Sequence, residues 1–151
     1  MIAVEYGDAH NVAEIMPVMQ KAFDPAFGEA WTAAQTLAAL SLPNSRLAIA
    51  KDNTVIGFAI SRWVLEEEEL LMIAVAPDQQ RKGIASILLK QIIAEMVNNE
   101  RKTLFLEVRD GNPAHIFYKN KGFNEIGRRR NYYTGANGMT FDAITMNLSI
   151  Q

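Results

Sequence analysis

The chain of 151 residues contains no cysteine and only two histidines, His10 and His115, which lie far apart in the sequence. Without cysteine there is no disulfide, no thiolate zinc site and no cysteine nucleophile. The two histidines form no cluster with metal-ligand spacing, so we expect no metal. The G-x-S-x-G and P-loop patterns are also missing. An acyl transfer by this chain must therefore be direct or use some other nucleophile.

Long apolar runs and an excess of basic charge are missing too. No stretch approaches the roughly 20 apolar residues that a membrane-spanning helix needs. The N-terminal residues have no basic leader and no cleavage pattern, so we expect a cytoplasmic protein without a membrane partner. The formal net charge of −2 gives no reason to expect nucleic-acid binding. The length and the apolar fraction of 49% predict one domain, residues 1–151.

Hydrophobic periodicity predicts strands and helices along the whole chain. Asp8 is expected to cap a first helix, and Thr32 with Gln35 forms a capping box for a second helix through Leu40. Strands are predicted at 2–6, 46–51, 55–64, 70–76, 103–109, 123–133 and 139–148, and further helices at 83–98 and 113–121. This order predicts a mixed α/β fold, a twisted sheet of about seven strands flanked by about four helices. Its central parallel pair is joined by a helix.

Residues 72–89 are the most informative stretch. An apolar run ends at Pro77, a polar loop follows, and Gly83 opens a helix. The first turn of a helix has free N–H groups and a positive dipole end, which attract anions. Gly83 has no side chain to hinder a ligand, and Arg81 and Lys82 add positive charge. We interpret the stretch as a pyrophosphate site, although an ordinary strand-to-helix connection has the same local pattern.

Three residues are candidates for chemistry, and each also has a purely structural explanation. Glu107, near the end of an apolar strand, is either a general base whose pKa is raised by partial desolvation or a structural carboxylate paired with Arg109 or with solvent. Tyr118, on a short helix, is either a proton donor to a departing thiolate or a packed ring. Asn112 precedes Pro113 and suits a helix N-cap.

Two charged segments also have alternative interpretations. If Arg128 to Tyr133 form a strand, alternation puts Arg129, Asn131 and Tyr133 on one side and Arg128, Arg130 and Tyr132 on the other. Such a strand is either a charged, solvated edge or part of a site. The acidic run 66–69 is a solvated loop or, as a hypothesis, steers a basic protein tail to the site. Trp31 and Trp63 are interpreted as packing residues.

Several motifs resemble one known superfamily. Gln80-x-x-Gly83-x-Ala85, preceded by Val75-x-Pro77, resembles the acyl-CoA signature of the GCN5-related N-acetyltransferases (GNAT). Within that superfamily the chain is similar, over essentially its whole length, to the bacterial RimI family, which acetylates the N-terminal alanine of a small-subunit ribosomal protein. The likeness rests on Leu106-Glu107-Val108-Arg109, Asn112, Tyr118, Gly122-Phe123-Asn124-Glu125 and Arg129-Arg130-Asn131-Tyr132-Tyr133.

The resemblance implies acetyl-CoA as cosubstrate, Glu107 as base, Tyr118 as acid and the N-terminal peptide of a ribosomal protein as partner. It implies acyl-CoA contacts at Ile73, Ala74, Val75, Arg81, Lys82, Gly83, Ile84, Ala85, Ser86 and Asn112. Asn112 and Tyr118 lie six residues apart, one fewer than is usual in that family, which affects the expected contact of Asn112. We expect a monomer or a weak homodimer.

Two other functions compete with a protein acceptor. A small polycationic amine, such as a polyamine or an aminoglycoside, would also suit the acidic run. A peptide needs an open groove between residues 27–33 and 132–138, whereas a small amine needs a closed pocket. The chain could also bind acyl-CoA without catalysis, but a mere binding module needs neither Glu107 nor Tyr118.

Overall fold

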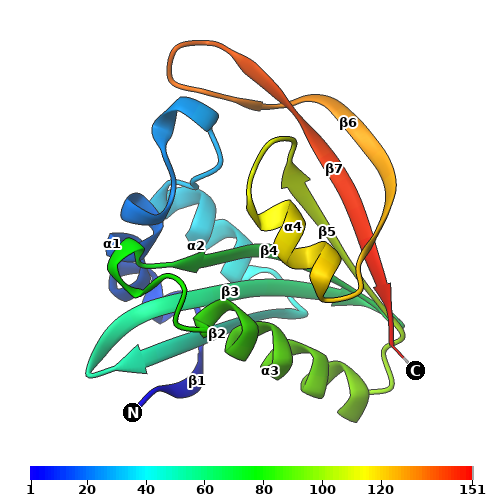
Figure 1. Ribbon diagram of the computed structural model, residues 1–151. Coiled ribbons are helices and arrows are strands. Elements are labelled where there is room, and N and C mark those ends of the chain that lie inside the picture. Colours follow the sequence, from blue (N-terminus) through cyan, green and yellow to red (C-terminus); the bar gives the residue numbers. More distant parts are fainter. Residues whose placement is uncertain (151) are drawn as a thin grey trace.

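The computed structural model describes residues 1–150 and contains a seven-stranded sheet with the order β1-β2-β3-β4-β5-β7-β6 (Figure 1). The strands are β1 (Ala3–Gly7), β2 (Ser45–Asp52), β3 (Thr54–Val64), β4 (Glu67–Val75), β5 (Thr103–Arg109), β6 (Asn124–Thr134) and β7 (Thr140–Ser149). The helices are α1 (Val12–Ala22), α2 (Ala33–Ser41), α3 (Ile84–Asn98) and α4 (Ala114–Asn120). The predicted mixed α/β fold is confirmed.

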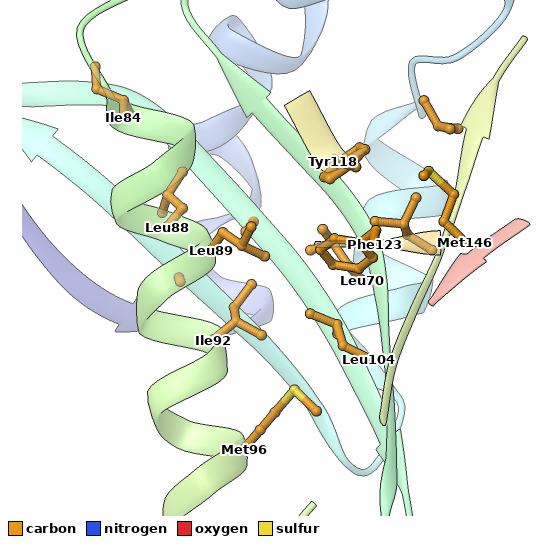
Figure 2. Close-up of a cluster of buried hydrophobic side chains, with 14 of the residues drawn as sticks. Leu70, Ile84, Leu88, Leu89, Ile92, Met96, Leu104, Tyr118, Phe123 and Met146 are labelled. Atoms are coloured by element: carbon orange, nitrogen blue, oxygen red, sulfur yellow. The ribbon is translucent and has the colours of Figure 1, made fainter. Parts of the chain in front are cut away.

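Two apolar cores lie on opposite faces of the sheet. The face under α1 and α2 is built around Ile15, Met19, Leu47, Phe58 and Ile60. The other face packs against α3 and α4. Its buried side chains include Ile84, Leu88, Leu89, Ile92 and Met96 from α3. Figure 2 shows Leu89, Ile92 and Met96 on the side of α3 that faces Leu70, Leu104, Phe123 and Met146. Both cores follow from the helical and strand periods of the sequence.

Strands β4 and β5 are the parallel pair, but they stay together only at their beginnings. Residues 67–70 pair with residues 103–106, and no pairing follows. Leu71 has no partner on β3, which makes a one-residue bulge in β4. Figure 1 shows β4 (green) and β5 (yellow-green) running apart from a common start. The divergence opens the middle of the sheet.

The structure differs from the sequence-based predictions at the starts of α1 and β4. Asp8 caps a short 3₁₀ turn, Ala9–Asn11, which precedes α1. The capping box of Thr32 and Gln35 at the start of α2 is confirmed. Strand β4 begins at Glu67, so most of the acidic run belongs to a strand and not to a loop.

Glu68 is buried, although the sequence predicts a solvated loop at the acidic run 66–69. Its side chain is 0% exposed and forms ion pairs with Arg46 at 2.8 Å and with Arg101 at 3.2 Å. The Trp63 ring lies against both guanidinium groups, 4.8 Å from Arg46 and 4.2 Å from Arg101. This cluster is structural, and the interpretation of Trp63 as a packing residue agrees with it.

Candidate active site

A cleft of about 510 Å³ occupies the place where β4 and β5 diverge. Its walls come from the two diverging strands, the segment 112–118, the loop after α1 and the end of β6. At one end it reaches Gln80 and Ala85 beside α3, and at the other it reaches Glu29 and Tyr133. The cleft thus passes from the α3 side of the sheet to the side of α1 and α2.

The α3 end of the cleft has the features expected of an anion site. Gly83 has φ +80°, and a Cβ added there would meet no atom within 4 Å, so its backbone borders open space. No side chain caps the free N–H groups of the first turn of α3. Arg81 and Lys82 are exposed beside it. The residues present therefore fit a diphosphate group, which main-chain donors and the helix dipole attract.

The diverging part of β4 offers main-chain donors to the cleft. The N–H of Ala76 donates to the Ile56 carbonyl on β3 at 2.8 Å. Successive N–H groups of a strand point to opposite edges, so those of Val75 and Ile73 point to the edge facing β5. No strand pairs with β4 there. These two groups are available to a ligand lying between the strands.

Glu107 lies in the wall of this cleft and its carboxylate is held by two donors. Thr145 Oγ1 donates to Glu107 Oε2 at 2.7 Å. Arg129 Nε lies 2.7 Å from Glu107 Oε1. The Glu107 side chain is only 10% exposed, whereas that of Arg129 is 61% exposed. The carboxylate is thus fixed in orientation and can be reached from the cleft.

Tyr118 lines the same cleft from α4, and its ring is buried against Phe117 and Phe123 in edge-on contacts. Burial raises the pKa of the Tyr118 hydroxyl, and the nearby Tyr133 hydroxyl adds to the effect. The hydroxyl therefore stays neutral and can donate a hydrogen bond. Figure 2 shows the ring beside Phe123 and Leu70.

Arg109 does not pair with Glu107, which corrects one of the predicted alternatives. Arg109 Nε lies 3.2 Å from Glu29 Oε1, and its guanidinium stacks on the Phe27 ring at 3.7 Å. Asn112 Nδ2 donates to Glu29 Oε2 at 2.7 Å, and Asn112 Oδ1 accepts from the Ala114 N–H at 2.8 Å. Asn112 thus holds the start of α4, as its structural interpretation predicted, and ties that start to the loop after α1.

A bulge in β6 overturns the predicted alternation of side chains there. Asn131 has φ +52°, and residues 130–132 lie in an irregular stretch between two regions of regular pairing with β7. As a result Tyr132 and Tyr133 both line the cleft, with ring centroids 4.9 Å apart. Arg129 lies over the Tyr132 ring at 5.4 Å. Burial raises the pKa of Tyr133, and the negative charge of Glu29 adds to the shift.

The loop after α1 and the β6–β7 loop touch each other beside the end of the cleft at Glu29 and Tyr133, which is called the acceptor end below. The Ala136 N–H donates to the Pro25 carbonyl at 3.0 Å. Two glycines make the close approach possible. A Cβ on Gly28 would lie 2.0 Å from the Thr134 carbonyl oxygen, and one on Gly135 would lie 1.9 Å from that of Ala26. The two loops that flank the predicted groove are therefore bridged where these glycines meet.

The predicted site residues divide into two groups. Seven of them line the cleft directly: Ile73, Ala74, Val75, Ala85, Glu107, Asn112 and Tyr118. Arg81, Lys82, Gly83 and Ser86 lie on the adjoining loop and first turn of α3, and the Ile84 side chain is buried in the core, leaving only its backbone for a ligand. Sequence reasoning gave no individual role to Phe27 and Glu29, which lie in the range 27–33 of the expected groove and which no local motif singles out, and it named Tyr133 only as part of the motif 129–133.

Comparisons with known proteins agree with this geometry. Residues 12–123 match the model of the Acetyltransferase (GNAT) family. The chain belongs to the GNAT acetyltransferase family. A Salmonella typhimurium relative, named [ribosomal protein bS18]-alanine N-acetyltransferase, is 46% identical over 105 residues, 69% of this chain and 70% of the relative. The crystal structure of the ribosomal-protein-S18-alanine N-acetyltransferase from Escherichia coli has a TM-score of 0.87 at 33% identity, covering 100% of this chain and 95% of that one.

The acetyltransferase uses acetyl-CoA, as the members of its family do. A solved Salmonella typhimurium structure that contains acetyl-CoA shares the fold, with a TM-score of 0.79 at 20% identity, and covers 100% of this chain and 95% of that one. Within residues 1–150 no group of three or more His, Asp or Glu side chains could hold a metal ion. No helix of the same residues is long and apolar enough to cross a membrane.

Proposed function

We propose that this acetyltransferase moves the acetyl group of acetyl-CoA to the α-amine of a protein, the N-terminal alanine of ribosomal protein bS18. The observation that carries the proposal is the likeness to enzymes named for that reaction, at 46% identity in sequence and over the whole chain in structure. The held carboxylate of Glu107 in the cleft supports it. We place the reaction in the cytoplasm, with the enzyme as a monomer or weak homodimer.

The coenzyme is proposed to bind from the α3 side. Its diphosphate lies against residues 81–86, and its pantetheine arm runs between β4 and β5 toward Glu107. The N–H groups of Ile73 and Val75 hold this arm and donate to the thioester oxygen as negative charge develops there. Placing both substrates in one passage through the sheet removes much of the entropy barrier of their encounter. Asn112 faces the same passage, but its amide is engaged by Glu29.

The transfer is direct. The neutral amine attacks the thioester carbon, a C–N bond forms and the C–S bond breaks, and the nitrogen loses a proton to Glu107, directly or through a water molecule. A free α-amine has a pKa of ~7.7–8, so about a tenth is neutral near pH 7, against far less than a thousandth for lysine at ~10.4. One carboxylate is therefore an adequate base for an α-amine.

Tyr118 is proposed to act as the general acid for the leaving thiolate of coenzyme A. Its neutral hydroxyl donates a hydrogen bond to the thiolate as the C–S bond lengthens, and can pass on its proton to complete coenzyme A. Burial keeps this hydroxyl protonated. Edge-on contacts with the Phe117 and Phe123 rings hold the Tyr118 ring in place.

One observation favours a second candidate, a small polycationic amine. The contact between Ala136 and Pro25 closes part of the acceptor end, and a closed pocket suits a small acceptor better than a peptide. The acceptor classes are separated by assaying four compounds with acetyl-CoA: a peptide starting with alanine, the same peptide with a blocked α-amine, spermidine and an aminoglycoside.

The proposal predicts turnover of the free peptide alone, with the acetyl group located on the α-nitrogen by mass spectrometry. Glu107→Gln should lower kcat at least about a hundredfold, as expected for loss of a general base, while the KM for acetyl-CoA stays unchanged. If the blocked peptide is modified equally, or if spermidine is preferred, the acceptor is not a protein α-amine.

A further inference from the structure

The four glutamates of the run 66–69 have different surroundings, and only one of them belongs to the cleft. Glu66 lies 3.6 Å from Lys102, and Glu67 borders a separate surface hollow next to Lys102 and Leu65. Glu68 is buried in its ion pairs. Glu69 lines the cleft. An acceptor-binding role for the acidic run therefore falls on Glu69.

Among the carboxylates that line the cleft, Glu69 alone is free. Asp24 accepts from the Ala26 N–H at 2.9 Å. Glu29 is held by Arg109 and Asn112, and Glu107 by Thr145 and Arg129, as described above. Within the described chain, residues 1–150, no hydrogen bond or ion pair engages Glu69. Its oxygens are available to a ligand.

The position of Glu69 places it on the acceptor side. On β4 its neighbour Leu70 points into the α3 core, so Glu69 faces the opposite side of the sheet, as Phe105 and Glu107 do on β5. Glu69 lies directly opposite Phe105, two residues before Glu107. Glu69 is exposed, whereas the Glu107 side chain is 10% exposed. Glu69 is thus at the mouth of the cleft and Glu107 is deeper.

The charges around Glu69 come from three strands. Arg62 is its cross-strand partner on β3, Glu107 lies on β5, and Arg129 reaches in from β6. Partial desolvation at the cleft wall raises the pKa of Glu69 and the charge of Glu107 raises it further, while Arg129 and Arg62 oppose the shift. Neither arginine forms an ion pair with Glu69 within residues 1–150. The carboxylate can therefore pair with a cation from outside the protein.

We infer that Glu69 is a specificity-determining residue that binds a lysine or arginine side chain close behind the N-terminal residue of the acceptor. The inference rests on the proposed function. When the α-amine is at Glu107, the chain leaving the cleft passes its mouth, where the free carboxylate of Glu69 meets the next side chains. A basic side chain there gains a partner that a neutral one lacks.

The test compares two peptides with the same N-terminal alanine, one with lysine and one with glutamine at positions 2 and 3. At low salt the wild-type enzyme should favour the lysine peptide by about three- to tenfold in kcat/KM. Glu69→Gln should bring this ratio close to one, with kcat/KM for the glutamine peptide changed less than about twofold. Below the raised pKa of Glu69 the wild-type preference should also disappear, because the protonated carboxyl carries no charge.

Glu67→Gln is the matched control, because Glu67 is on the same strand and the same face but outside the cleft, and it should keep the preference. The Glu69 inference is overturned if Glu69→Gln keeps the preference, if it lowers both peptides equally, or if the wild-type enzyme uses both peptides equally well. If the wild-type enzyme acetylates neither peptide, the proposed function itself fails. Thermal unfolding of each variant shows that the fold is retained.

Discussion

Arg129 Nε lies 2.7 Å from Glu107 Oε1, so the proposed base already has a cationic partner before an acceptor arrives. The arginine side chain is 61% exposed and the glutamate 10%, so the arginine covers the carboxylate from the solvent side. A cationic acceptor has to compete with this guanidinium for the same oxygen. The pair therefore sets how strongly the cleft attracts positive charge.

Replacing Arg129 by glutamine should lower the KM for a cationic acceptor by about two- to fivefold, the range of a largely exposed ion pair. The KM for acetyl-CoA should stay the same, because Arg129 lies on β6 and its contacts are with Glu107 and Tyr132, not with residues 81–86. Steady-state kinetics at low salt measures both constants. Arg130→Gln is the control, since Arg130 is exposed on the same strand without an ion pair in the described chain. An unchanged or raised acceptor KM in Arg129→Gln would contradict the competition.

Thr145 positions Glu107 from the neighbouring strand, where the two residues are register partners. Thr145→Val keeps the shape and removes the donor, so kcat should fall about five- to tenfold, equivalent to a hydrogen bond of ~1 kcal/mol. Thr145→Ser should restore most of the rate, since the hydroxyl is kept. A loss in the serine variant as large as in the valine variant would point to packing and away from the hydrogen bond.

Alanine substitutions at Gly83 and at Gly138 distinguish the effect of backbone strain from the effect on ligand binding. Gly83→Ala should lower the free energy of unfolding by roughly 1 kcal/mol because φ is +80°. It should also raise the Kd for acetyl-CoA more than tenfold, because the new Cβ occupies the space needed by the diphosphate. Gly138→Ala provides the comparison, since Gly138 has φ +82° and equally open surroundings but lies in the β6–β7 loop. It should show the same loss of stability, by denaturant unfolding, with unchanged acetyl-CoA binding by calorimetry.

Glu68 should contribute to stability and not to acceptor binding. Glu68→Gln leaves two mostly buried arginines without their carboxylate, so the free energy of unfolding should fall by about 3 kcal/mol. Glu67→Gln, one residue earlier and exposed, should stay within ~0.5 kcal/mol of the wild type. Urea unfolding measures both. A small effect for Glu68→Gln would mean that Trp63 and water compensate for the lost pairs.

The sequence predicted the order of elements because the period of apolar residues is a local property. The α3 face, the Thr32 capping box and the existence of the strands β4 and β5 all follow from such local patterns. The proposed sites at Gly83 and Glu107 could be predicted because their motifs are short and contiguous. What was missed depends on residues distant in the sequence. Glu68 is buried by Arg46 and Arg101, and Glu107 is paired from β6.

The bulge at Asn131 explains the remaining error. Alternation assumes a regular strand, and a positive φ at one residue shifts every side chain that follows. Tyr132 and Tyr133 both reach the cleft for this reason. The contact between the two loops was equally hidden, because it depends on Gly28 and Gly135 meeting from segments far apart in the chain.

The divergence of β4 and β5 has a kinetic consequence. Coenzyme and acceptor would enter the same passage from opposite faces, so neither has to leave before the other arrives. In the direct transfer proposed above, both must be present together when the bond is made. Initial-rate plots at several fixed concentrations of one substrate should therefore give intersecting lines, the signature of a ternary complex, and an isolated acyl-enzyme should never accumulate.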